Sequence, residues 1–147
     1  MQKINLAGKW QLSQDGKPSI PGTLPGSTYL DYIENGMEDP FWGENETKAN
    51  ELARHDYRYS REFDLLGEML LKEHLELVAD GLDTLRTIRI NGKIAGKTDN
   101  INRVWRIDVK NLCVQGKNTI DIDFANPYTE IEKRQSADPL PGGTPIP

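Results

Sequence analysis

The stretch DPFWGENE, residues 39–46, places aromatic rings next to acids and an asparagine. Glu44 and Glu46 are two residues apart, so their carboxylates can share one face of an extended segment. Two carboxylates that face each other across a bond are what glycoside hydrolysis requires. Acids in an exposed loop are more commonly solvated, however. This pair alone therefore does not identify an active site.

The aromatic residues Phe41 and Trp42 are unusual in a segment that also contains proline and glycine. Loops generally avoid large aromatic rings unless the rings pack on protein or bind a ligand. The residue types leave both interpretations open at this point.

Other chemistries have no matching motif. His55 and His74 have no cysteine partner at a metal-ligand spacing, so we expect no metal site. The segment GGTP follows no strand-to-helix pattern and is not a phosphate-binding loop. Neither a nucleophile elbow nor an acidic calcium loop is present. The sequence therefore predicts no cofactor and contains no complete active site.

Composition narrows the class of protein. The 147 residues suffice for one domain with a real core, and the net charge of −5 argues against a nucleic-acid partner. A single cysteine, Cys113, rules out an internal disulfide. No apolar run approaches the roughly 18 residues of a spanning helix, and the first residues lack the apolar core of a signal peptide. These observations do not indicate the cellular compartment of the protein.

Alternation of apolar and polar residues predicts that most of the chain forms strands. The predicted strands span residues 8–13, 57–65, 75–79, 84–90, 104–109 and 118–126. Asn91-Gly92 is a strong hairpin signal because both central positions of a type I′ turn need positive φ. Ser27 and Gly36 are suited to begin and end one short helix, at residues 27–36.

These elements predict an all-β fold, an antiparallel β-sandwich or jelly roll with one short helix. We expect the sandwich to occupy residues 1–127. Residues 128–147 are rich in proline and glycine and lack alternation, so they are expected to form a linker or an extended segment. A proline-rich end of this kind suggests a piece of a longer protein.

Four large or charged residues favour structural roles. Trp10 and Trp105 lie on alternating strands and are expected in the core. Arg61 and Arg103 are expected to pair with acids within or between the sheets.

Several segments resemble a known enzyme family. Those similar to the N-terminal domain of β-mannosidases of glycoside hydrolase family 2 are GKWQLS, IPGTLPGSTYLDYIENG, DPFWGENE and HDYRYSREFDL. Those similar to the sugar-binding domain of family 2 in general are DGLDTLRTIRINGKIAGKTDNINRVWRIDV and GKNTIDIDFANP. The resemblance covers residues 4 to about 128, and residues 20–46 favour a mannosidase over its relatives.

The resemblance implies a jelly-roll domain of the galactose-binding type, followed by an immunoglobulin-like domain and a (β/α)₈ barrel. Those downstream domains would be its partners, and the intact enzyme would act on mannosides or mannose-ended oligosaccharides. Two glutamates on the barrel would perform retaining hydrolysis, and neither lies in this chain. The chain alone is therefore expected to be inactive, and its exposed interdomain surface could make it self-associate.

The resemblance also gives DPFWGENE a role. In galactosidase relatives the corresponding loop lends an asparagine to the edge of the active site, and by position it matches Asn45. We hypothesise that Asn45, with Glu44 and Trp42, lines the subsite for the terminal mannose. The alternative is that Phe41 and Trp42 pack, either over the end of the sandwich or against another domain.

Three further interpretations stay open. The chain could be a stand-alone carbohydrate-binding module or a purely structural spacer. It could also be the same domain of another family 2 enzyme, a β-galactosidase or a β-glucuronidase.

Overall fold

The computed structural model describes residues 1–15, 17–37, 42–82 and 86–137. Its strands are β1 (Gly8–Gln14), β2 (Ile20–Leu24), β3 (Tyr57–Leu65), β4 (Glu76–Ala79), β5 (Arg86–Ile90), β6 (Lys93–Thr98), β7 (Trp105–Asp108) and β8 (Gly116–Phe124). Its helices are α1 (Thr28–Glu34), η1 (Gly43–Asn45), α2 (Glu46–Leu52), α3 (Gly67–Leu70), η2 (Lys110–Leu112) and α4 (Pro127–Ala137).

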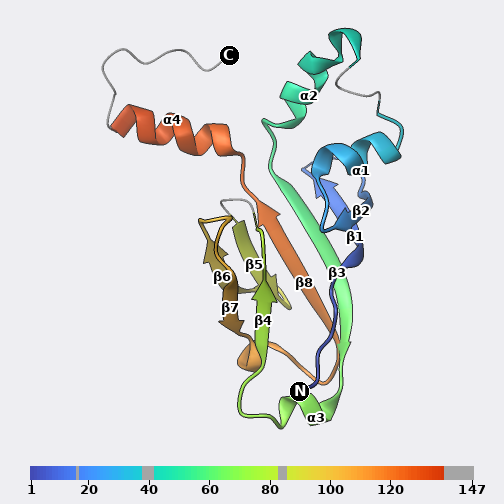
Figure 1. Cartoon of the computed structure of the whole chain (residues 1–147), viewed down its shortest axis with the longest axis vertical. Helices are drawn as coiled ribbons and strands as arrows, with labels where there is room; N and C mark the ends of the chain where they lie inside the picture. Colours follow the sequence, from blue (N-terminus) through green and yellow to red (C-terminus); the bar gives the residue numbers. More distant parts are fainter. Residues whose placement is uncertain (16, 38–41, 83–85, 138–147) are drawn as a thin grey trace.

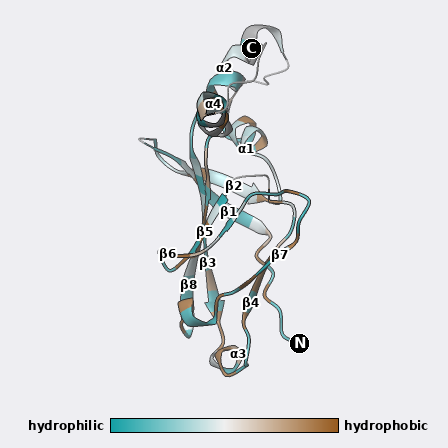
Figure 2. Ribbon diagram, turned by 90° about the vertical axis from the view of Figure 1, so that its left-hand side faces the viewer, coloured by the Kyte–Doolittle hydropathy of each residue, from teal (hydrophilic) through white to brown (hydrophobic). Residues whose placement is uncertain are grey.

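The strands form two antiparallel sheets. The larger sheet has the order β2-β1-β3-β8-β5-β6, and the smaller one pairs β4 with β7. Figure 2 shows the small sheet facing the large one, with α1, α2 and α4 gathered at one end of the sandwich and α3 at the other. The predicted all-β antiparallel sandwich is confirmed.

The pairing of β3 with β8 forms the middle of the large sheet (Figure 1). These two nine-residue strands pair along their whole length, from Tyr57 opposite Phe124 to Leu65 opposite Gly116. Because side chains alternate across a strand, one face of this pair is apolar and the other polar. The strands β1 and β5 extend the sheet on either side.

The core lies between the two sheets. Its fully or almost fully buried members include Trp10, Leu12, Tyr59, Ile88, Ile90, Ile120 and Ile122. Leu77, Ala79 and Ile107 cover them from the small sheet. Trp10 is thus a core residue as predicted, whereas Trp105 is half-buried at the start of β7.

The outer face of the large sheet carries a charged cluster. Asp123 on β8 accepts hydrogen bonds from Arg58 Nε at 2.5 Å and from Arg89 Nε at 3.0 Å. Partial burial would raise the pKa of Asp123, but the two arginine hydrogen bonds outweigh it and hold the pKa below its usual range. The cluster links β3, β8 and β5 on the face that does not contact the small sheet.

Local turn and cap signals behave as predicted. Asn91 and Gly92 have φ of 50° and 80° in the turn between β5 and β6. Asn91 also donates from Nδ2 to the Leu112 carbonyl at 2.9 Å, so the turn is held to η2. Ser27 caps α1 by accepting a hydrogen bond from the Leu30 amide at 3.3 Å.

The structure contains more helix than the sequence predicted. Residues 128–137 were expected to belong to a linker or extended segment, but they continue the helix α4. Pro127 stands at its first position, where a missing N–H costs nothing, and the Asn126 side chain accepts from the Tyr128 amide at 2.9 Å. The domain boundary at residue 127 stays a prediction, and residues 138–147 lie outside the described residues.

Over the described parts of the chain, none of the helices combines the length and apolar character needed to cross a membrane.

A close approach between the sheets generates a stability prediction. A Cβ added at Gly96 on β6 would lie 2.7 Å from Ile107 Cδ1 on β7. We expect Gly96→Ala to destabilise the fold by about 1 kcal/mol in urea unfolding, because the Ile107 side chain must leave its position to make room.

The control is a double-mutant cycle with Ile107→Val, which removes the clashing Cδ1. The double variant should be less destabilised than the sum of the two single variants. Strict additivity would show that Gly96 is not needed for this contact.

Candidate functional site

The described part of the segment that the sequence singled out, residues 42–46, forms a turn and begins a helix at one end of the sandwich. Residues 43–45 form η1 and α2 follows at once, so Glu44 and Glu46 do not lie on an extended strand as supposed. The Asn45 amide donates to the Trp42 carbonyl at 3.4 Å, which closes the turn. We call residues 42–45 the Trp42–Asn45 turn.

The side chains of this turn differ in exposure. The Trp42 ring is 79% exposed, so it does not pack into the sandwich. Asn45 is half-buried and has interactions of its own within the protein. Phe41 and the side chains of Glu44 and Glu46 lie outside what the structure describes. Of the three predicted site residues, Trp42 and Asn45 therefore sit close together on one turn, and the structure leaves Glu44 open.

A buried carboxylate holds the neighbouring helix α1 against the sheet. Asp31 is 2% exposed and accepts hydrogen bonds from the Thr23 amide at 3.0 Å and from the Tyr59 hydroxyl. Gly22 makes room for this contact, since an added Cβ would lie 2.9 Å from the Tyr59 ring. One side chain thus connects α1, β2 and β3. Its hydrogen bonds supply the partners that a buried polar group requires.

The Tyr59 hydroxyl is held in its neutral form. Burial, followed by the hydrogen bond to Asp31, raises the pKa of Tyr59 far above its usual range. The Tyr59 ring also packs on Phe124, with the centroids 5.3 Å apart. Tyr59 is therefore a structural donor to Asp31. No sequence pattern indicates this pairing, because Asp31 resembles an ordinary polar residue of an exposed helix.

The two arginines expected to pair with acids have other partners. Arg61 donates from Nη1 to the carbonyls of Leu6 and Ala7, at 2.9 and 2.8 Å. The Arg103 guanidinium lies 4.6 Å from the centre of the Trp105 ring. Among the described residues neither arginine forms the expected ion pair, and backbone carbonyls and an aromatic ring are their partners instead.

A shallow hollow of about 360 Å³ lies on the outer face of the large sheet. Its polar lining consists of Ser13, Asp15, Asp56, Arg58, Thr87 and Asp123. Arg58 and Asp123 already form a hydrogen-bonded ion pair there. The hollow therefore resembles an ordinary solvated surface whose charged groups pair with each other.

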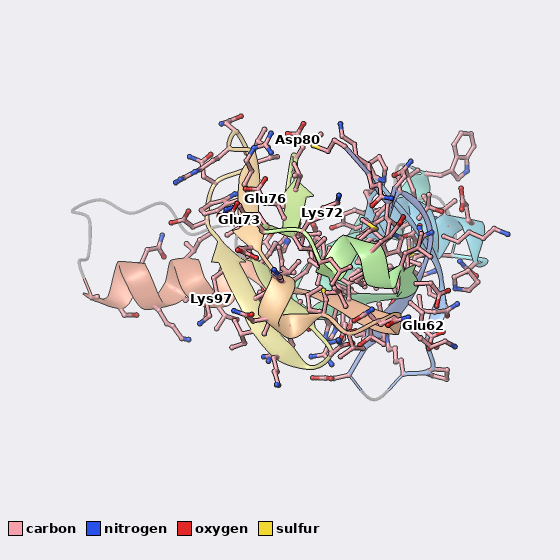
Figure 3. All side chains as sticks on the ribbon, turned by 90° about the horizontal axis from the view of Figure 1, so that it is seen from below. Glu62, Lys72, Glu73, Glu76, Asp80 and Lys97 are labelled. Carbon is pink, nitrogen blue, oxygen red and sulfur yellow. The ribbon has the colours of Figure 1, made fainter. Side chains whose placement is uncertain are left out.

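Figure 3 views the molecule from the end that carries α3 and labels charged side chains around the sandwich, among them Glu62 and Glu76. Glu76 pairs with Arg106 at 3.3 Å and Glu62 with Lys117 at 3.1 Å. Exposed pairs of this kind contribute little to stability. No group of three or more metal-ligating residues occurs within the described ranges.

Comparison with known proteins gives the family. A family model described as "Glycosyl hydrolase 2 galactose-binding domain-like" matches residues 10–145. The chain belongs to this family of galactose-binding-like domains of glycosyl hydrolases.

Individual relatives refine the comparison. A "Probable beta-mannosidase" of Caenorhabditis elegans is 32% identical over 134 residues, which cover 89% of this chain and 15% of that protein. A "Beta-mannosidase" of Bos taurus is 28% identical over 133 residues, with the same coverage. The chain thus spans about 15% of the length of these curated relatives.

A solved structure is similar over nearly the whole chain. The crystal structure of a β-D-mannosidase from Dictyoglomus thermophilum matches with a TM-score of 0.90 and 33% identity, covering 95% of this chain and 18% of that one. A β-D-glucuronidase of the same organism matches with a TM-score of 0.61 and 18% identity, covering 82% of this chain and 19% of that one. The second likeness concerns the fold alone.

The buried Asp31 contact generates a prediction. Tyr59→Phe keeps the ring and removes only the donor to Asp31, so we expect a loss of about 1–3 kcal/mol in the free energy of unfolding. The matched control is Tyr128→Phe, since the Tyr128 hydroxyl makes no hydrogen bond among the described residues. Equal stability of the two variants in urea unfolding would contradict the role given to Asp31.

Proposed function

We propose that this chain is the N-terminal accessory domain of a retaining β-mannosidase, an enzyme that removes terminal β-D-mannose from non-reducing ends. The observation that carries the proposal is the similarity to the Dictyoglomus thermophilum β-D-mannosidase, at a TM-score of 0.90 and 33% identity. The glucuronidase of that organism is a weaker match in both measures.

The proposed work of the domain is to shape the site while another domain performs the chemistry. The nucleophile and the acid/base of retaining hydrolysis would be two glutamates of a downstream (β/α)₈ barrel. The small share of each relative that the chain covers leaves ample room for such a barrel and an immunoglobulin-like domain. By this proposal the 147 residues alone do not hydrolyse mannosides.

The Trp42–Asn45 turn is proposed to line the subsite for the terminal mannose. The exposed Trp42 ring presents a face that could contact a sugar or a neighbouring domain. Asn45 carries both a donor and an acceptor, as sugar hydroxyls require. Both residues stand on one short turn at one end of the sandwich, so a barrel packed there would bring them to the substrate together.

The test uses the full-length protein that carries this domain and compares its kcat/KM on 4-nitrophenyl β-mannoside, β-galactoside and β-glucuronide. We expect the mannoside to be preferred. Asn45→Ala should lower kcat/KM on the mannoside about tenfold, which corresponds to about 1.4 kcal/mol of transition-state stabilisation.

Asn50→Ala serves as the matched control, because Asn50 is an exposed residue of the adjoining helix α2. It should leave kcat/KM unchanged. Preference for another glycoside would contradict the substrate proposal. An unaffected Asn45→Ala variant would remove the turn from the subsite and leave the substrate proposal standing.

A further inference from the structure

Two segments leave the large sheet side by side at the end that carries α2 and α4 (Figure 1). The last pair of the β3–β8 ladder is Tyr57 opposite Phe124. The chain before Tyr57 comes from α2, and the chain after Phe124 leads into α4. The orientation of α2, and of the turn ahead of it, is therefore set where these two segments meet.

Asn126 connects the two segments through its backbone amide and its side-chain amide. Its backbone amide donates to Asp56 Oδ1 at 2.6 Å, and its Nδ2 donates to the Arg54 carbonyl at 2.5 Å. Its Oδ1 accepts from the Tyr128 amide at 2.9 Å and so caps α4. The Arg54 guanidinium also lies 5.4 Å from the centre of the Tyr128 ring. One asparagine thus fixes the exit from α2 and the start of α4.

Tyr57 holds the last residue of α2 directly. Its hydroxyl donates to the Leu52 carbonyl at 2.5 Å. Burial, followed by the proximity of Tyr32 and Tyr29, raises the pKa of Tyr57 far above its usual range, so the donor is retained at all working pH values. The Tyr57 ring packs edge-on against Tyr32, with the centroids 6.1 Å apart. The ring is therefore itself held in place.

These anchors matter because α2 has little stability of its own. A helix of seven residues is too short to persist in water without tertiary contacts. The exposed residues Lys48, Asn50 and Glu51 show that much of its surface faces away from the protein. The contacts at its C-terminal end therefore keep α2 in a single orientation.

We propose that Tyr57 and Asn126 are positioning residues that hold α2, and through it the Trp42–Asn45 turn, in one place before any ligand binds. The effect on catalysis rests on the function proposed above, whereas the ordering of α2 does not. If the turn is ordered beforehand, ligand binding loses no free energy to ordering it. The expected effect is therefore on binding affinity.

The first experiment measures amide hydrogen exchange of the 147-residue chain. Tyr57→Phe removes only the hydroxyl that reaches Leu52 and should accelerate exchange of the α2 amides about five-fold, the factor that one hydrogen bond contributes. Asn126→Asp keeps an acceptor for Tyr128 and loses the donor to Arg54, and should act in the same direction. Exchange in β3 and β8 should not change.

Tyr32→Phe is the matched control. It makes the same chemical change in the same aromatic cluster, but the Tyr32 hydroxyl donates to Gln14 on β1 and not to α2. Its α2 amides should exchange as in the unmodified chain. Unchanged exchange in Tyr57→Phe, or equal acceleration in both tyrosine variants, would overturn the proposal.

The second experiment separates positioning from general stability in the full-length protein, with 4-nitrophenyl β-mannoside as substrate. Tyr57→Phe should raise KM about five-fold and leave kcat within about two-fold, because binding must then order the turn. A purely structural role would instead reduce the active fraction and hence the apparent kcat, with KM unchanged. That result would overturn the positioning role.

The two proposals fail in distinguishable ways. If the unmodified full-length protein ignores mannosides, the proposed function falls, and the exchange result alone decides whether Tyr57 and Asn126 position α2. If exchange responds but KM does not, the turn is held in place without serving the site, and the catalytic part of the inference is wrong.

Discussion

The antiparallel pairing of β3 with β8 is the interaction on which the rest of the structure depends. The two nine-residue strands pair over their full length and place one apolar face toward the small sheet. On one side β1 and β2 continue the large sheet, and on the other side β5 and β6 do so. The same pairing brings the end of α2 and the start of α4 together at one end. Both the core and the candidate site are thus positioned by one ladder.

Polar contacts organise the end of the molecule that carries α1, α2 and α4, whereas apolar contacts dominate the core between the two sheets. Asp31 holds α1 to β2 and β3, while Tyr57 and Asn126 hold α2 beside the start of α4. Hydrogen bonds are directional, so they fix orientation where short helices cannot bury enough apolar surface to do so. Directional contacts therefore set the orientation of the short helices at this end of the sandwich.

Local signals made most of the fold predictable. The alternation in β3 and β8, the Asn91-Gly92 turn and the Ser27 cap each depend on neighbours in sequence, and each was predicted correctly. The helix α4 was missed because residues 128–147 were taken together as a segment rich in proline and glycine, although Pro127 suits the first position of a helix.

The candidate site was less predictable, because it depends on contacts between residues far apart in sequence. Asp31 reads as an exposed helix residue until Tyr59, 28 positions later, is placed beside it. The anchoring of α2 depends on Asn126, which is 72 residues from its partner Arg54. No periodicity or motif signals such pairs.

The most direct test of the proposed subsite is a crystal structure of the full-length protein with a mannose-configured inhibitor. The account predicts Asn45 within about 3 Å of a sugar hydroxyl, and an Asn45 side chain with no polar contact to the sugar would contradict it.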